Sequence, residues 1–293
     1  MKTVRVAAAQ YPIDAVTDWA AKLESWIAEG ARDADLIVFP EYAALELSAT
    51  LPDAVRADPG AEIAALQALW EPWQALHRAA ARRHGVHILA GSFPVRLADG
   101  TVRNRALLVA PDGAMGGQDK LIMTRFEREE WMITGGEAFR VFDTALGRLA
   151  VTLCYDVEFP LIARAAVEAG ADILLAPSCT DTAAGFHRVM VGARARALEN
   201  QCFVVTAPTV GEAPWSRALD VNIGAAGIFA PPERGFPDDG ILALGQREAP
   251  GWVRATLNRS ALAVARAQGQ VLNHRHWPEQ ARLPAPIVVP LTP

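Results

Sequence analysis

The feature that most constrains this chain is a regular alternation of short apolar runs with stretches of helical periodicity. The apolar runs have the length and composition of buried strands, and the intervening stretches carry apolar residues at helical spacing. Helices that alternate with strands connect parallel neighbours and cover both faces of a sheet, so we predict an α/β fold. The predicted strands span residues 4–9, 36–39, 86–92, 106–110, 149–153, 173–176, 203–207 and 253–257, and the predicted helices span residues 19–32, 63–84, 161–169, 187–199 and 260–267.

Gly and Pro residues interrupt the region between residues 223 and 241, which contains the turn sequence PPERG at residues 231–235. Such punctuation is typical of hairpins rather than of parallel crossovers, so we expect mixed sheets. The chain contains no Ser/Gly linker, low-complexity tract or internal repeat. We therefore expect one domain over residues 1–293, with a core of about residues 1–280 and a Pro-rich tail at residues 281–293.

Composition narrows the class of partner. The net charge is -5 and the isoelectric point is about 5.7, so the chain lacks the basic surface of a nucleic-acid-binding protein. No apolar run reaches the roughly 20 residues of a membrane-spanning helix, and the N-terminal residues lack the apolar core of a secretory signal. We expect a cytoplasmic protein that binds a small molecule. The three cysteines have spacings that suit neither a disulfide framework nor a zinc site, which favours reduced thiols.

Two predicted strands end in residues that are capable of chemistry. Glu41 comes directly after Pro40, which ends one apolar strand. Cys154 comes directly after the apolar run at residues 149–153. The carboxyl ends of strands are where α/β proteins assemble their sites, and a sharp turn there exposes a sulfur beside backbone N–H groups. A solvated loop glutamate and a buried structural cysteine are the alternatives. Because the placement is repeated, we interpret both residues as parts of a site.

Lys120 stands out because the chain has only three lysines among its 28 basic residues. Arginine supplies the rest of the positive charge, and its planar guanidinium differs from a compact ammonium. Lys120 follows a turn at residues 111–113 and heads a further apolar segment. A surface lysine is the alternative, but a buried lysine beside a forming oxyanion is a known catalytic device. We predict that Lys120 belongs to the site.

A Glu, a Lys and a Cys at three strand ends resemble the nitrilase superfamily of carbon-nitrogen hydrolases. The resemblance covers about residues 1–278, and although each motif alone is weak, their order and separation are specific. The motifs are RVAAAQ at residues 5–10, FPE at 39–41, DKL at 119–121, CYD at 154–156, RALEN at 196–200 and GFPDDG at 235–240.

The resemblance implies a four-layer α-β-β-α sandwich of two mixed sheets that pairs into homodimers or larger homo-oligomers. It also implies a second acid after the lysine, which positions the substrate or Lys120 rather than taking the first proton. Spacing favours Glu127 for this role over its neighbours Glu129 and Glu130.

The chain departs from the superfamily pattern after the nucleophile. Many members carry an Arg where this chain has Glu158 and an acid where it has Leu161. The departure concerns substrate choice and local ion pairs rather than the nucleophile. We interpret Glu158 as an acid near a helix N-terminus, where the helix dipole stabilises it.

Cys179 also lies just past an apolar strand and is the rival nucleophile. The resemblance assigns its segment to the wall of the pocket instead. We expect Asp181 or His187 to contact a polar group of the substrate, although an acid that caps the next helix is the alternative. The other predicted substrate contacts are Tyr42, Trp131, Cys179 and Thr180.

Other chemistries fit the sequence less well. His274 and His276 lie two positions apart without further ligands nearby, so no metal is assigned. The segment AGSFP at residues 90–94 lacks the second Gly of a serine-hydrolase elbow. No Gly-rich nucleotide loop follows any strand, so we expect no cofactor.

The expected reaction is hydrolysis of a non-peptide carbon-nitrogen bond in a small amide. Glu41 accepts the Cys154 proton, and Lys120 and the Tyr155 backbone N–H meet the oxyanion. Ammonia then leaves, and water releases a carboxylic acid from the thioester. Hydrolysis of a small nitrile is the alternative within the class. A catalytically silent oligomeric binding module, or a synthase-associated subunit that handles ammonia, is the alternative outside it, and the intact Glu-Lys-Cys set argues against silence.

Overall fold

Strand β1 (Thr3–Pro12) joins two sheets into one pairing network. A computed structural model describes residues 2–291 of the chain. Strand β1 pairs in parallel with β2 (Leu36–Val38) and antiparallel with β13 (Gly251–Asn258), and its last two residues pair in parallel with β9 (Phe203–Glu212). The strand order is therefore β5-β4-β3-β2-β1 in the first sheet and β9-β8-β7-β6 in the second.

Both sheets are mixed, as the sequence predicts. Strands β1, β2 and β3 run parallel to one another, as do β7, β8 and β9, whereas the pairs β3–β4, β4–β5, β6–β7 and β11–β12 are antiparallel. The bounds of the remaining strands are β3 (His87–Arg96), β4 (Val102–Val109), β5 (Met115–Asp119), β6 (Val141–Thr144), β7 (Gly147–Val151), β8 (Ile173–Ser178), β10 (Val221–Asn222), β11 (Gly227–Phe229) and β12 (Ile241–Leu244).

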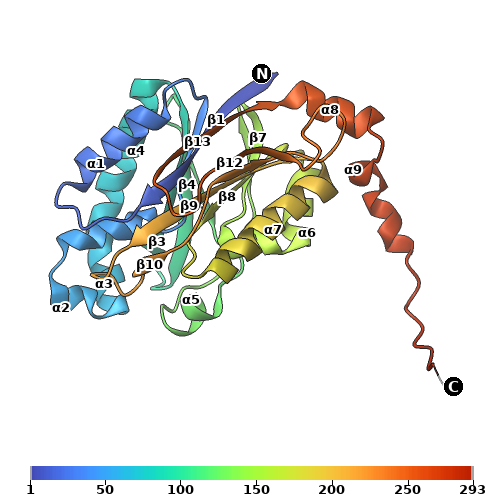
Figure 1. Cartoon of the computed structure of the whole chain (residues 1–293). Helices are drawn as coiled ribbons and strands as arrows, with labels where there is room; N and C mark the ends of the chain where they lie inside the picture. Colours follow the sequence, from blue (N-terminus) through green and yellow to red (C-terminus); the bar gives the residue numbers. More distant parts are fainter. Residues whose placement is uncertain (1, 292–293) are drawn as a thin grey trace.

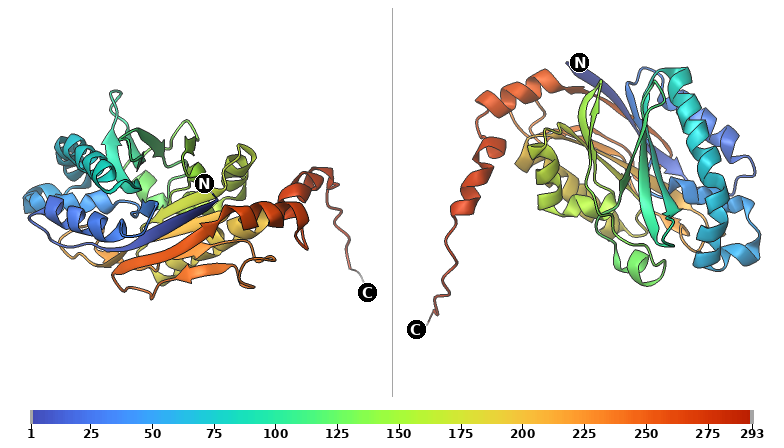
Figure 2. Two further views of the ribbon diagram at one scale, coloured as in Figure 1. Left: turned by 90° about the horizontal axis from the view of Figure 1, so that it is seen from above. Right: turned by 180° about the vertical axis from the view of Figure 1, so that it is seen from behind.

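Helices cover the outer faces of the two sheets. Figure 1 shows α1 (Trp19–Gly30) and α4 (Trp70–His84) on one side of the strands and α6 (Pro160–Glu168) and α7 (Ala183–Asn200) on the other, and the two views of Figure 2 agree. The layers therefore follow the order α-β-β-α, which confirms the predicted sandwich. The other helical segments are η1 (Ala43–Thr50), α2 (Asp53–Arg56), α3 (Pro59–Leu66), η2 (Gln67–Leu69), α5 (Arg125–Glu129), η3 (Cys154–Glu158), α8 (Arg259–Gln268), α9 (Asn273–His276) and η4 (Trp277–Arg282).

Strands β2 and β8 explain why the buried strands are uninterrupted apolar runs. Leu36 and Val38 pack in the core between the two sheets, whereas Ile37 packs in the core beneath α1 and α4. In β8, Leu175 faces the core between the sheets and Leu174 faces the core beneath α6 and α7. Because successive side chains of a strand point to opposite faces, a strand that is covered on both sides must be apolar at every position.

One predicted helix is wrong in its extent. Residues 63–84 do not form a single helix, because α3 ends at Leu66 and the turn η2 precedes α4. Pro72 provides the reason, since a proline inside a helix collides with the carbonyl four residues earlier and lacks an N–H to donate. The structure places Pro72 in the first turn of α4, where a missing N–H costs little. Every other predicted strand and helix overlaps an observed one.

The C-terminal residues leave the body of the fold. After η4, residues 283–291 form no helix or strand, and Figure 1 shows them extending away from the sheets. Across residues 2–291, no helix combines the length and the apolar character that crossing a membrane requires.

Candidate active site

The residues that follow three strands line one cavity of about 610 Å³. Glu41 follows β2, Lys120 follows β5, and Cys154 follows β7. All three side chains contribute to the cavity wall, and each is at most 5% exposed. The structure therefore brings together the three residues that the sequence singles out.

A close approach between two strands positions Glu41. Gly91 in β3 adopts a φ of +80°, and a Cβ atom at this position would lie only 2.1 Å from the carbonyl oxygen of Pro40. Only glycine fits such a position without a backbone shift. Tyr42, the residue after Glu41, has a left-handed φ of 56°, and its N–H donates to Ser92 Oγ at 2.8 Å. These contacts turn the chain sharply on either side of the carboxylate.

Three donors surround the Glu41 carboxylate. Lys120 Nζ lies 2.8 Å from Oε1, Asn104 Nδ2 lies 2.9 Å from the same oxygen, and the backbone N of Cys179 lies 3.2 Å from Oε2. Burial raises the pKa of Glu41 to about 7, although the charge of Lys120 opposes this rise. A carboxylate with a pKa near neutrality is suited to accept and return a proton under physiological conditions.

Lys120 forms a second ion pair with Glu127. The Lys120 Nζ lies 2.6 Å from Glu127 Oε2, and the Thr124 hydroxyl and backbone N–H donate to the same oxygen. Burial disfavours the charge on Lys120, but attraction to Glu41 and Glu127 outweighs it and raises the lysine pKa well above its usual value. Burial tends to raise the pKa of Glu127, but the charge of Lys120 and its hydrogen bond outweigh burial and lower this pKa below the usual value. Lys120 and Glu127 therefore stay charged, and Glu41 changes its charge near neutral pH.

Cys154 sits at a strained turn. Its φ of 47° lies in the left-handed region, where a non-glycine residue is disfavoured, and it begins the short helix η3. Burial, followed by the negative charge of Glu41, raises the pKa of the thiol well above its usual value, and Lys120 opposes this rise. A hydrogen bond with Cys154 lowers the pKa of Glu41, and the Cys154 thiol donates to the carbonyl oxygen of Cys179, whose N–H donates to Glu41. The resting state is a thiol beside a base.

Asp156 links the turn at Cys154 to the segment after Lys120 by hydrogen bonds. Its buried carboxylate accepts hydrogen bonds from the backbone N–H of Leu121 at 3.1 Å and of Ile122 at 2.8 Å. Lys120 follows β5, and the apolar residues that it heads turn toward Asp156. Burial raises the pKa of Asp156 to about 6, against the effect of its two hydrogen bonds.

Most of the predicted substrate contacts line the cavity. They are Tyr42, Trp131, Cys179, Thr180 and Asp181, together with Tyr155 and Glu127. His187 is the exception, since it is exposed on α7 and is not among the lining residues. Gly185, Arg188 and Val189 present the face of α7 that lines the cavity, and at 100° per residue His187 lies off that face. Glu129 and Glu130, the rivals of Glu127, are exposed.

Sequence analysis missed Asn104. This buried residue of β4 donates from Nδ2 to Glu41 Oε1 and, at 3.2 Å, to Glu127 Oε1. Its polar neighbours Arg103 and Arg105 suggest a loop, and the predicted strand starts only at residue 106. Tyr42 was expected at the site, but not its hydroxyl group's hydrogen bond to Glu127 Oε1 at 2.7 Å. Together, these two donors hold the carboxylates on either side of Lys120.

The site holds a thiol, a base of near-neutral pKa and a fixed ammonium, and this set allows nucleophilic attack with stabilisation of an oxyanion. Over residues 2–291, no cluster of three or more His, Cys, Asp and Glu side chains is arranged to hold a metal ion.

A model of the carbon-nitrogen hydrolase family matches residues 5–246. The chain belongs to this family. It is 35% identical over 244 residues to a probable hydrolase of Bacillus subtilis, YhcX, a match that covers 82% of this chain and 47% of that protein. It is 31% identical over 222 residues to a deaminated glutathione amidase of Yersinia enterocolitica, over 70% of this chain and 72% of that protein.

The fold agrees with this assignment. The structure of Saccharomyces cerevisiae Nit3, described as a member of branch 10 of the nitrilase superfamily, superposes with a TM-score of 0.71 at 20% identity. The superposition covers 91% of this chain and 94% of that chain. The resemblance to the nitrilase superfamily is confirmed. The chain matches only about half (47%) of the length of the Bacillus relative.

Proposed function

We propose that the protein is an amidase that hydrolyses a small amide to ammonia and a carboxylic acid through a thioester on Cys154. One observation carries the proposal: the Cys154 thiol, a Glu41 carboxylate with a pKa of about 7 and the Lys120 ammonium line the same cavity. A weak electrophile such as an amide needs all three, because the thiol must lose its proton and the carbonyl oxygen must gain charge.

Acylation begins when Glu41 takes the Cys154 proton and the sulfur attacks the carbonyl carbon. The carbonyl oxygen becomes an oxyanion, and Lys120 and the Tyr155 backbone N–H are the proposed donors to it. One well-placed donor of this kind contributes roughly 3 to 4 kcal/mol to the stability of the transition state. The carbon-nitrogen bond then breaks, and the leaving nitrogen takes the proton from Glu41. Ammonia departs and the thioester remains.

Deacylation uses the same groups in the same order. Glu41, again ionised, removes a proton from water, and the resulting hydroxide attacks the thioester carbon. The oxyanion forms beside Lys120 once more and collapses with cleavage of the carbon-sulfur bond. The sulfur recovers its proton from Glu41, and the carboxylic acid leaves. Glu127 is a positioning residue in this scheme, since it holds Lys120 at 2.6 Å without meeting the substrate carbonyl.

The fixed ammonium supports an amide over a nitrile. Attack on an amide places a full negative charge on oxygen, which Lys120 meets at once. Attack on a nitrile instead forms a thioimidate, whose nitrogen must be protonated before water is added. That proton has to come from Glu41, since Lys120, whose pKa lies well above its usual value, is a poor proton donor, so the ammonium contributes less to this reaction than to amide hydrolysis. Nitrile hydrolysis is therefore the second candidate reaction, and nitriles are included among the substrates tested below.

Ammonia release from small amides, ω-amidated acids, carbamoyl compounds and nitriles tests the proposal. We expect turnover of at least one amide class, and loss of turnover in Cys154→Ala and Lys120→Ala. Cys202→Ala is the matched control, because Cys202 is buried away from the cavity lining and its replacement removes a thiol of the same size. Release that survives in Cys154→Ala contradicts the assignment of the nucleophile.

The thioester itself has a direct readout. When the reaction is quenched with acid during turnover, the intact mass of the protein is expected to increase by that of one acyl group, and the adduct is expected on the peptide that contains Cys154. Ammonia release by the wild-type protein without any acyl adduct in samples quenched within the first turnover contradicts covalent catalysis.

A further inference from the structure

Glu158 is the innermost charged residue of the cavity wall apart from Glu41, Lys120 and Glu127. Its side chain is 22% exposed. Every other charged residue that lines the cavity is exposed at its mouth, where water screens its charge. These residues are Arg125, Asp181, Arg188, Arg217 and Asp220. Within the described part of the chain, Glu158 is thus the charge that a bound substrate meets after the mouth and before the nucleophile.

The position of Glu158 relative to Cys154 is fixed by a single short helix. The two residues begin and end η3 (Cys154–Glu158). At about 2 Å of rise per residue in such a helix, their Cα atoms lie about 8 Å apart along its axis. A substrate whose carbonyl carbon reaches the Cys154 sulfur therefore presents atoms a few bonds away to the Glu158 carboxylate.

Among residues 2–291, the Glu158 carboxylate pairs loosely with one exposed guanidinium. Its ion pair is with Arg188, whose Nε lies 3.6 Å away, longer than a hydrogen bond, and whose side chain is 61% exposed. Burial raises the pKa of Glu158, and Arg188 and Lys120 oppose the rise. Proximity to the N-terminus of α6, expected to stabilise this acid, thus does not offset its burial, and the N-cap residue of α6 is Phe159. A half-buried carboxylate in this state gains from a closer cation.

The exposed arginines at the mouth are less suited to select a charge. Arg125 pairs with Glu129 at 2.8 Å and its side chain is 87% exposed. Arg217 donates to the carbonyl oxygen of Ala57 at 2.8 Å. Both guanidinium groups thus have partners of their own on exposed residues, whereas Glu158 is half-buried.

We infer that Glu158 binds a cationic group of the substrate, so that the preferred substrates are small amides that carry a protonated amine a few bonds from the carbonyl. The ammonium takes the place of the Arg188 guanidinium beside Glu158, and Arg188 turns into the solvent that already surrounds it. This inference rests on the proposed amidase function and adds to it a substrate class and a residue that selects it.

Three amides of one length test the inference: β-alaninamide is cationic, butanamide is neutral, and succinamate is anionic. We expect the wild-type kcat/KM to be highest for β-alaninamide. In Glu158→Gln, which keeps the shape and removes the charge, kcat/KM for β-alaninamide is expected to fall about tenfold or more, because a charge-assisted hydrogen bond is lost. The value for butanamide is expected to change by less than about twofold, since no charge is involved.

Two variants act as controls in opposite directions. Arg188→Gln frees Glu158 and is expected to raise kcat/KM for β-alaninamide by about threefold, the size of a half-exposed ion pair. Asp220→Asn removes an acid from the mouth of the same cavity and is expected to leave the ratio of the β-alaninamide and butanamide values unchanged. If Glu158 has only a structural role, Glu158→Gln would change kcat/KM for all three amides by the same factor. Arg188→Gln would then leave the preference for β-alaninamide unchanged.

The failures of the inference and of the proposed function look different. Turnover of all three amides with no preference for β-alaninamide, or with a preference that Glu158→Gln leaves intact, overturns the inference and leaves the amidase in place. A preference for succinamate overturns it in favour of the arginines at the mouth. No ammonia from these amides or from any other amide of the wider panel removes the amidase proposal, and the inference with it.

Discussion

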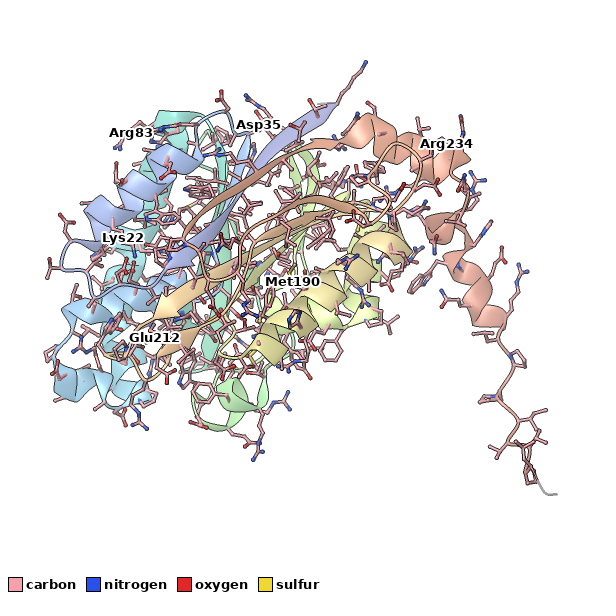
Figure 3. The ribbon with its side chains drawn as sticks, viewed as in Figure 1. Lys22, Asp35, Arg83, Met190, Glu212 and Arg234 are labelled. Atoms are coloured by element: carbon pink, nitrogen blue, oxygen red, sulfur yellow. The ribbon has the colours of Figure 1, made fainter. Side chains whose placement is uncertain are left out.

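Lys120, which is buried, and Lys22, which is partly buried, lie among similar neighbours in different parts of the molecule. Lys120 contacts the carboxylates of Glu41 and Glu127 at the cavity. Lys22, on α1 and labelled in Figure 3 on the side of the molecule that α1 covers, contacts the carboxylates of Glu46 and Asp14, the latter at 2.7 Å. Its side chain is 12% exposed. Two of the three lysines in the chain thus bridge pairs of acids.

The Lys120 and Lys22 clusters are also alike in their acids and in the groups that donate hydrogen bonds to these acids. Burial raises the pKa of Glu46, as it does that of Glu41, and each cluster includes a buried tyrosine whose hydroxyl donates to a carboxylate. The difference is that the residues of the Lys22 cluster do not line the cavity at Lys120, which holds the Cys154 thiol, and that Lys22 also donates to the Pro12 carbonyl oxygen at 2.6 Å. A perturbed carboxyl group therefore marks a site only when space and a nucleophile accompany it.

The largest expected difference between the clusters is in turnover. We expect Lys120→Met to lower kcat for the best amide by about a thousandfold or more, because the oxyanion loses its donor and two buried carboxylates lose their shared cation. Lys22→Met is expected to leave kcat within about twofold, since Lys22 lies outside the cavity lining. Steady-state ammonia release measures both. Equal losses in the two variants would mean that the Lys22 cluster acts on the site through the fold.

The next difference is in stability. Lys22→Met leaves Glu46 buried without its cation, and we expect the free energy of unfolding to fall by about 3 to 5 kcal/mol. Adding Glu46→Gln to Lys22→Met removes the uncompensated charge and is expected to restore part of the loss. Urea unfolding followed by circular dichroism measures both variants. If the double variant is no more stable than the single one, burial of the Glu46 charge is not the cause.

The pH dependence of catalysis separates the two raised carboxyl groups. In the proposed mechanism the ionised form of Glu41 accepts the Cys154 proton, so kcat/KM is expected to fall about tenfold per unit as the pH drops below the Glu41 pKa of about 7. Glu46→Gln is expected to keep this limb of the profile. If the acidic limb of the profile shifts in Glu46→Gln, the titrating group belongs to the Lys22 cluster and is not Glu41.

Stability responds to pH with the opposite sign. The folded pKa of Glu41 is about 7 against an ordinary value of 4.5, so between these values folded Glu41 holds a proton that the unfolded chain has released. The contribution of Glu41 to the free energy of unfolding therefore decreases as pH rises through this window. Glu41→Gln is expected to make stability less dependent on pH between 5 and 7 in urea unfolding. An unchanged slope would contradict the raised pKa.

The two clusters also show how far sequence reasoning reaches. Glu41 and Cys154 are recognisable because each follows an apolar strand, which is visible in sequence as a local pattern, and Lys120 is recognisable because lysine is scarce in this chain. Asn104 and the Tyr42 hydroxyl bond are not recognisable in this way, because their partners are 63 and 85 residues away in the chain. The Lys22 cluster was missed for the same reason, since Glu46 lies in a short helix that no periodicity predicts. Contacts across layers depend on how the sheets pack, and a strand pattern does not contain that information.

The smallest expected difference comes from a matched pair of tyrosines. Tyr42 donates to Glu127 Oε1 at 2.7 Å and Tyr11 donates to Glu46 Oε2 at 2.8 Å, and both side chains are at most 3% exposed. Replacing either with Phe removes one buried hydrogen bond, so each variant is expected to lose about 1 to 2 kcal/mol of stability. Only Tyr42→Phe is expected to slow turnover, by about threefold to tenfold, because Glu127 then holds Lys120 less firmly. A similar slowing in Tyr11→Phe would show that lost stability alone reduces kcat, and the distinction between a catalytic and a structural lysine cluster would then rest on the Lys120 and Lys22 variants alone.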